Sequence, residues 1–107
     1  MDDDLREYLN ELKARLVRFL EGRNFRLVLY GSRARGDYDE DSDIDVAIIV
    51  EGLSRDLKDR VLDLVIDLEM ERLRPISSLV LSQADFDALR DRERRIAIDI
   101  EEEGIVV

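Results

Sequence analysis

The sequence predicts an α/β (α+β) fold, a small mixed β-sheet packed with about three helices in the order α-β-β-α-β-α. Leucines at three- to four-residue spacing open the chain, whereas the short apolar runs that follow are bounded by glycine, proline or serine. A length of 107 residues is enough for one hydrophobic core and too short for two. Residues 1–107 are therefore expected to form a single domain.

The outer elements follow from these patterns. The leucine stripe predicts a helix over about residues 3–21, which Gly22 ends. Strands are predicted from the runs FRLVLYG, DIDVAIIV and ISSLVLS and, as a small addition, from the tail GIVV: residues 25–31, 43–50, 76–82 and 104–107. A last helix is expected to begin after Ser82 as its N-cap. Its core face is expected to carry Phe86, Leu89, Ile96 and Ile100.

The segment between the second and third strands fits two structures. Residues 54–74 contain both a helical apolar stripe and a strand-like alternation. Their length and Ser54 as a cap favour a helix, closed by Pro75. The strand alternative would place Asp67 or Glu69 in the sheet.

Composition limits the function. With no cysteine and no histidine, disulfides, thiolate metal sites and imidazole chemistry are excluded. A net charge of −10 argues against direct nucleic-acid binding, because phosphate contacts need a basic surface. No apolar run is long enough to cross a membrane, and the acidic start lacks the pattern of a signal peptide, so a cytoplasmic protein is expected.

One loop concentrates negative charge. Residues 37–45 contain six carboxylates in nine positions, and an ordered fold tolerates such repulsion when a cation lies among them. An EF-hand needs Gly at position six and Glu at position twelve of its loop. Counting from Asp37, those positions hold Ser42 and Ile48, and later starting points fail as well. A calcium loop of that type is therefore excluded.

The pair Asp43 and Asp45 suggests a different cation. Residues two apart on a strand point to the same face, so both carboxylates can converge on one or two divalent ions. Ile44 and Val46 would then face the core. Mg²⁺ prefers sites with one or two carboxylates completed by substrate phosphates. The sequence therefore predicts Asp43 and Asp45 as metal-binding residues.

A phosphate-binding bend is expected before this loop. Gly31 lets the backbone approach a phosphate closely, and Ser32 adds a hydroxyl and an amide as donors. Arg33 and Arg35 are the nearest cations and can neutralise a triphosphate. Ser42, next to Asp43, completes the candidate nucleotide-binding set.

The stretch GSRARGDYDEDSDID, Gly-Ser followed by ten residues and Asp-x-Asp, resembles the signature of the DNA polymerase beta-like nucleotidyltransferase superfamily. The short chain and the wording GSRARG…SDIDVAI look like its minimal nucleotidyltransferase (MNT) group, the antitoxin half of HEPN–MNT pairs. The resemblance implies an Mg²⁺-dependent enzyme that transfers AMP from ATP to a tyrosine of a HEPN-type toxin. It assigns the β- and γ-phosphates to Gly31 and Ser32. It also implies that Asp43 and Asp45 are catalytic residues that bind two Mg²⁺. Self-association is left open.

The sequence departs from this family at a third carboxylate, which is expected on the next core strand. Alignment of ISSLVLS with that strand places Ser77 or Ser78 there, and a serine is a poor metal ligand and no general base at neutral pH. The alternative reading is therefore a weak or inactive antitoxin, or a nucleotide-binding module, that works by binding its partner.

The last helix also carries Arg90, Arg92, Arg94 and Arg95. They are expected to form a solvated face paired with neighbouring acids. A docking surface for an oppositely charged partner is the alternative.

Overall fold

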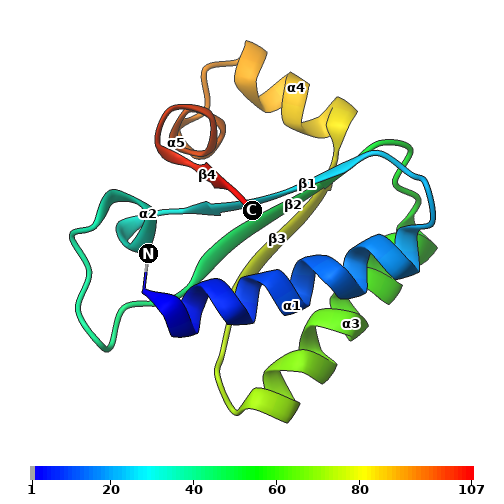
Figure 1. Ribbon diagram of the computed structural model, residues 1–107. Helices are drawn as coiled ribbons and strands as arrows, with labels where there is room; N and C mark the ends of the chain where they lie inside the picture. Colours follow the sequence, from blue (N-terminus) through cyan, green and yellow to red (C-terminus); the bar gives the residue numbers. More distant parts are fainter. Residues whose placement is uncertain (1) are drawn as a thin grey trace.

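The computed structural model describes residues 2–107, and Met1, the first residue of the predicted domain, lies outside them. Four strands form one sheet: β1 (Phe25–Tyr30), β2 (Asp45–Val50), β3 (Ser77–Ser82) and β4 (Ile105–Val106). The strand order is β3-β2-β1-β4 (Figure 1). β1 runs antiparallel to β2 and β4, whereas β3 runs parallel to β2. This confirms the mixed sheet and the short C-terminal strand.

The described residues form five helices: α1 (Asp3–Leu20), α2 (Ser32–Arg35), α3 (Arg55–Arg72), α4 (Gln83–Asp91) and α5 (Arg95–Glu103). Serine side chains begin two of them, because Ser54 accepts a hydrogen bond from the Leu57 amide and Ser82 accepts one from Asp85. Both serine caps were expected. None of the helices within residues 2–107 combines the length and apolar character that a membrane crossing needs.

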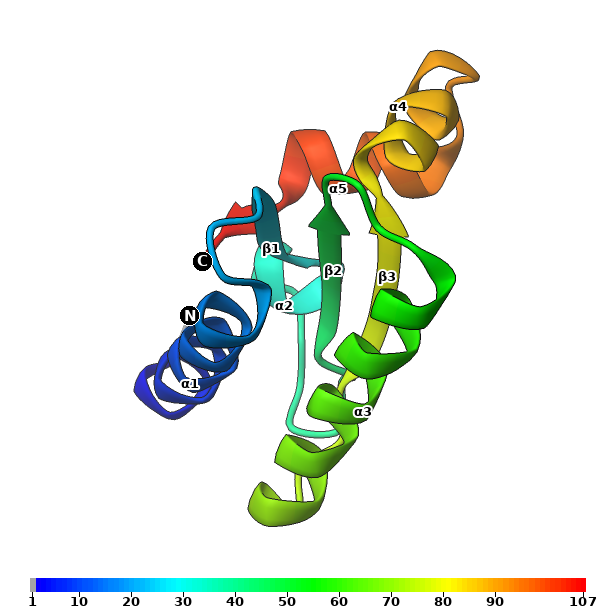
Figure 2. The ribbon, with the colours of Figure 1, turned by 90° about the vertical axis from the view of Figure 1, so that its right-hand side faces the viewer.

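The helices cover the two faces of the sheet. α1 and α3 lie against one face, and α4 and α5 against the other (Figures 1 and 2). Strand alternation supplies both cores, since Val46 and Ile48 point toward α1 and α3 while Ala47 and Ile49 point the opposite way. β2 is therefore buried on both faces, which explains its nearly continuous apolar sequence.

The segment over residues 54–74, which fitted either a helix or a strand, forms the helix α3. The strand alternative is therefore wrong. Val61, Val65 and Leu68 form the buried face of α3. Glu69, which the strand alternative would place in the sheet, accepts a hydrogen bond from the Ile76 amide and thereby fastens the turn that leads into β3. Neither Asp67 nor Glu69 therefore supplies a carboxylate to the sheet.

The single last helix is a second correction, because the chain breaks it into α4 and α5. Glu93 has a positive φ of 54° and Arg94 is extended. Residues 90–95 are all charged, so nothing apolar would hold a continuous helix against the sheet there. The break lets each short helix pack its own apolar residues, Phe86 from α4 and Ala97 and Ile100 from α5.

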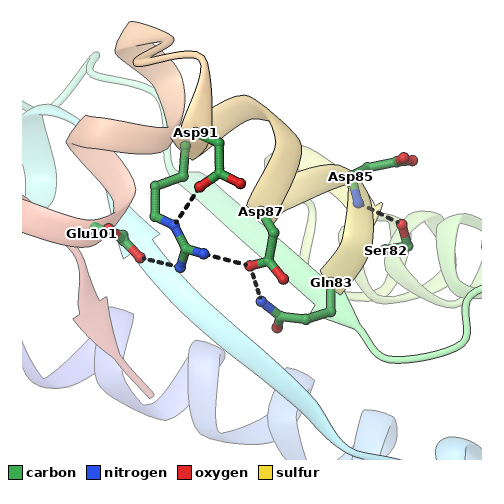
Figure 3. A network of polar contacts seen from close by, with 7 residues as sticks. Ser82, Gln83, Asp85, Asp87, Asp91 and Glu101 are labelled. Atoms are coloured by element: carbon green, nitrogen blue, oxygen red, sulfur yellow. Dashed lines mark hydrogen bonds and ion pairs between the residues drawn. The ribbon is translucent and has the colours of Figure 1, made fainter.

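Arg90 connects the two short helices. Its guanidinium pairs with Asp87 and Asp91 of α4 and with Glu101 of α5, at 3.3, 3.7 and 3.2 Å (Figure 3). The expected pairing of this arginine with neighbouring acids is therefore present. Only the pair with Glu101 crosses from α4 to α5. These pairs are solvent-exposed, so each contributes little to stability.

Packing of α1 on the sheet should dominate stability. Leu12 is fully buried in the core shared with α3, so Leu12→Ala should lower the free energy of unfolding by about 2–5 kcal/mol. Val17 on the same helix is 52% exposed, and Val17→Ala should change stability by less than about 0.5 kcal/mol. Urea denaturation of both variants measures the difference, and equal losses would contradict this account of the core.

Candidate functional site

The end of β1 meets the start of β2 at the Gly31 bend. The antiparallel register pairs Tyr30 with Asp45, which places Gly31 beside that carboxylate. Gly31 has φ 78° and ψ −157°, and a Cβ added there would lie 2.6 Å from Asp45 Oδ2. Any larger residue would clash with the carboxylate as well as strain the backbone. The structure thus brings together the glycine bend and one of the two aspartates.

Ser32 begins the one-turn helix α2. The amides of Ala34 and Arg35 both donate to the Gly31 carbonyl, at 3.1 Å. The preceding amides, of Ser32 and Arg33, belong to the first turn and have no acceptor within the helix. The backbone here presents donors next to Asp45, as phosphate binding requires.

The two aspartates differ in environment. The β-ladder begins at Asp45, so Asp43 lies in the preceding loop, which corrects the prediction that both stand on the strand. Burial still alternates as expected, because Asp43 is exposed, Ile44 is 3% exposed and Asp45 is half-buried. Burial, and then the charge of Asp43, raise the pKa of Asp45; interactions with Ser77 and Arg35 lower it.

Arg33 holds the acidic loop from inside. Its Nε and Nη2 donate to the Ser42 carbonyl at 3.1 and 3.0 Å, and its guanidinium lies 4.8 Å from the centre of the Tyr38 ring. The residue is only 7% exposed. Two of its donors and its planar face are thus used within the loop, which leaves less of it for a phosphate than the sequence suggests.

The remaining candidates lie around this loop. The Ser42 hydroxyl contacts Asp39, whose amide and carboxylate oxygen lie 3.0 and 3.3 Å away. Arg35 is exposed and pairs with Asp37 at 3.3 Å and with Glu103, at the end of α5, at 3.1 Å. The guanidinium of Arg35 therefore stays near Asp45 through an acid that is distant in sequence.

Ser77 occupies the position beside Asp45 on β3. The parallel register aligns the two residues, and the Ser77 amide donates to the Ile44 carbonyl at 2.8 Å. This agrees with the alignment that placed Ser77 or Ser78 where an acid was expected. Within residues 2–107, no group of three or more acidic side chains is placed to hold a metal ion. A metal here would have the two aspartates as its protein ligands.

Arg74 is a site residue that the sequence reasoning missed. A hollow of about 190 Å³ is lined by residues of the acidic loop, including Asp43 and Arg33, and by Arg74 and Pro75. Arg74 forms no ion pair with any residue in the described part of the chain. The available signal was topological: parallel β2 and β3 begin at the same end of the sheet, so the residues before β3 must lie near Asp43.

Comparison with known families decides the classification. The family model described as "Nucleotidyltransferase domain" matches residues 5–107. This chain belongs to the nucleotidyltransferase domain family. The four-stranded mixed sheet with helices on both faces is the fold expected from the resemblance.

Individual relatives match over shorter stretches. Two proteins of Methanocaldococcus jannaschii, both provisionally named protein adenylyltransferases, are 48% and 44% identical over 44 and 45 residues, or 41% and 42% of this chain. The matches span less than half of those relatives, 44% and 41% of their lengths. A provisionally named nucleotidyltransferase from Sulfolobus solfataricus aligns with 99% of this nucleotidyltransferase domain and 86% of its own chain, at a TM-score of 0.48 and 19% identity.

Gly31→Ala and Gly36→Ala form a matched pair that tests the bend. Both glycines have positive φ, but a Cβ on Gly36 would meet nothing within 4 Å. Gly36→Ala should lower stability by about 1–2 kcal/mol through backbone strain alone. Gly31→Ala should cost at least about 1 kcal/mol more, because its backbone lies in a region essentially restricted to glycine and Asp45 must also move. Thermal and urea unfolding compare the two, and equal costs would show that Asp45 does not abut the bend.

The loop-holding role of Arg33 can be tested by Arg33→Lys. Lysine keeps the charge but cannot form the fork of two hydrogen bonds to Ser42 or the same stacking on Tyr38. Amides of residues 37–43 should therefore exchange with deuterium faster than in the wild type. Arg35→Lys, at an exposed position, should change this exchange less. Unchanged exchange in Arg33→Lys would contradict the role.

Proposed function

We propose that this domain is an Mg²⁺-dependent nucleotidyltransferase that transfers AMP from ATP to a hydroxyl, with tyrosine as the expected acceptor, of a HEPN-type toxin, and that it acts as the antitoxin. The approach of Gly31 to Asp45 carries the proposal, because it brings the glycine bend next to one of the two aspartates. The names of the two archaeal relatives support a protein as the acceptor.

The residues present fit a magnesium ion. Burial and Asp43 both disfavour the charged form of Asp45, and a bound cation would offset both effects. Two carboxylates are also a donor set that Mg²⁺ accepts when phosphate oxygens and water complete its shell. Asp43 and Asp45 would hold the ion. When bound, Mg²⁺ supplies Lewis-acid stabilisation of the charge that develops on the phosphates.

The domain's own groups would bind and orient the triphosphate. The Ser32 hydroxyl and the first-turn amides of α2 would donate to phosphate oxygens, which Gly31 allows to approach closely. The acceptor oxygen would attack the α-phosphorus, the bond to the β-phosphate oxygen would break, and pyrophosphate would leave. The hydroxyl proton would pass to solvent, since Ser77 cannot accept it at neutral pH.

Ser77 also favours a second candidate function. A serine beside Asp45 replaces a carboxylate that would complete the metal site or act as a base, so turnover should be slow or absent. In that case the domain would neutralise its partner by binding alone. Nucleotide would then bind without being consumed.

The decisive test mixes the protein with ATP labelled at the α-phosphate, Mg²⁺ and the product of the neighbouring gene. AMP transfer should add label and one AMP mass to that partner. Asp43→Asn and Asp45→Asn should each reduce the transfer rate by more than about 100-fold. Changing a residue that only supports a metal ligand typically costs up to about 100-fold, and loss of a ligand itself should cost more. Asp41→Asn, which removes the same charge from the same loop, should retain transfer.

Unfolding without Mg²⁺ provides the control for structure. Asp43 is exposed, and Asp43→Asn relieves repulsion of Asp45, so the variant should melt close to the wild type while losing Mg²⁺ binding. A large loss of stability would show that the aspartate is structural. A tight complex with no label transfer would favour the binding-only function instead.

A further inference from the structure

The outer face of α3 presents apolar side chains to solvent. Ile66, Met70 and Leu73 are 49%, 70% and 87% exposed and follow one another at four- and three-residue spacing. Ile66 and Met70 lie one turn apart on the same face of the helix, and Leu73 is the cap residue directly after its end. The core face of α3 is separate, since it consists of Val61, Val65 and Leu68. The exposed stripe therefore contributes little to the fold.

The backbone conformation and the solvent exposure of Leu73 are both unfavourable in the isolated domain. It caps α3 in the left-handed conformation, with φ 52° and ψ 40°, where glycine or asparagine is usual. Its amide donates to the Glu69 carbonyl, so the backbone serves the helix end, but the side chain packs on almost nothing. A large apolar residue in a strained conformation with most of its surface in water is best explained by contact with another molecule.

An acidic row runs alongside the stripe. Asp59, Asp63 and Asp67 are exposed, lie four residues apart, and form no ion pair with any residue in the described range. Asp63 and Asp67 each stand three residues before a member of the stripe, so the two rows adjoin. A second copy packed antiparallel along α3 would bring the same acids against them and be repelled. A complementary partner surface is apolar with a basic border.

This face adjoins the candidate site. Leu73 directly precedes Arg74, which lines the hollow together with Asp43, and Ser77 lies beside Asp45. The C-terminal end of α3 extends past the sheet at the end where β2 and β3 begin (Figure 2). A protein bound along α3 would therefore lie next to the hollow that Asp43 lines.

We propose that the stripe of Ile66, Met70 and Leu73, with its acidic border of Asp59, Asp63 and Asp67, docks a basic amphipathic helix of the protein acceptor. The acceptor's role rests on the proposed function, but the binding itself does not require nucleotide or metal. Burial of apolar surface supplies the affinity. The acidic border favours a positively charged partner and determines where along α3 it binds.

A synthetic peptide tests the surface directly. The probe is a fluorescent helix of about five turns with leucines on one face and lysine and arginine beside them, measured by fluorescence anisotropy without ATP or Mg²⁺. It should bind the wild-type domain, and added salt should weaken the binding. A peptide with glutamate in place of every basic residue should bind at least about tenfold more weakly.

Variants locate the binding. Met70→Ser and Leu73→Asn should each weaken peptide binding by about tenfold or more. Leu73→Asn should keep or raise the melting temperature, because asparagine tolerates the left-handed conformation, so its binding loss cannot come from misfolding. Val17 is an exposed apolar residue on α1, away from the stripe. The Val17→Ser variant should therefore bind the peptide as the wild type does.

Three results would overturn the docking surface: no binding of the basic peptide, equal binding of both peptides, or unchanged binding by Met70→Ser and Leu73→Asn. If AMP transfer to the partner occurs in the assay above while the peptide fails, the docking face is wrong and the proposed function stands. If the peptide binds as expected while no transfer occurs, the surface stands and the catalytic function fails.

Discussion

The approach of Gly31 to the Asp45 carboxylate determines the geometry of the rest of the site. It depends on one register, in which Tyr30 faces Asp45 across the β1–β2 ladder. A slip of one residue would reverse the faces of β2, turning Asp45 into the core and Val46 toward the loop. The buried residues on both faces of β2 prevent that slip. The packing of the sheet thereby fixes the distance between the Gly31 bend and Asp45.

The two arginines that follow Ser32 are engaged by groups other than Asp43 and Asp45. The one buried arginine, among the residues described, binds a backbone carbonyl rather than a carboxylate, so it orders the loop without neutralising Asp43 or Asp45. Arg35 is shared between Asp37 and Glu103. Arg35 lowers the pKa of Asp45, but burial and the charge of Asp43 outweigh this effect, so the negative charge at the two aspartates is only partly offset. The remaining charge is unfavourable in the isolated domain and suits a site that takes up a divalent cation.

Elements with a periodic sequence pattern could be predicted from the sequence, whereas features that have no such pattern could not. The leucine stripe has a helical period and predicted α1 closely. The serine caps mark where helices begin, and the short apolar runs predicted the strands. α2 has four residues between two glycines, too few for a helical period. The α4–α5 break falls in a run of charges with no apolar spacing. The spacing of Gly-Ser and Asp-x-Asp indicated one site, but the burial of Arg33 and the position of Arg74 depend on how the loop and β3 pack.

Ser77 links the chemistry of the site to the partner. Burial and the charge of Asp43 raise the pKa of Asp45, and the Ser77 side chain opposes that rise. A serine cannot, however, take a proton from an acceptor hydroxyl at neutral pH. Within the proposed function, the chain therefore supplies candidate groups for holding a nucleotide but none for activating the acceptor. Under the proposed function, the missing base has to be solvent or a side chain of the acceptor. A docking face beside the hollow makes the second option geometrically reasonable, because a partner held on α3 would bring its own groups to Asp43 and Asp45.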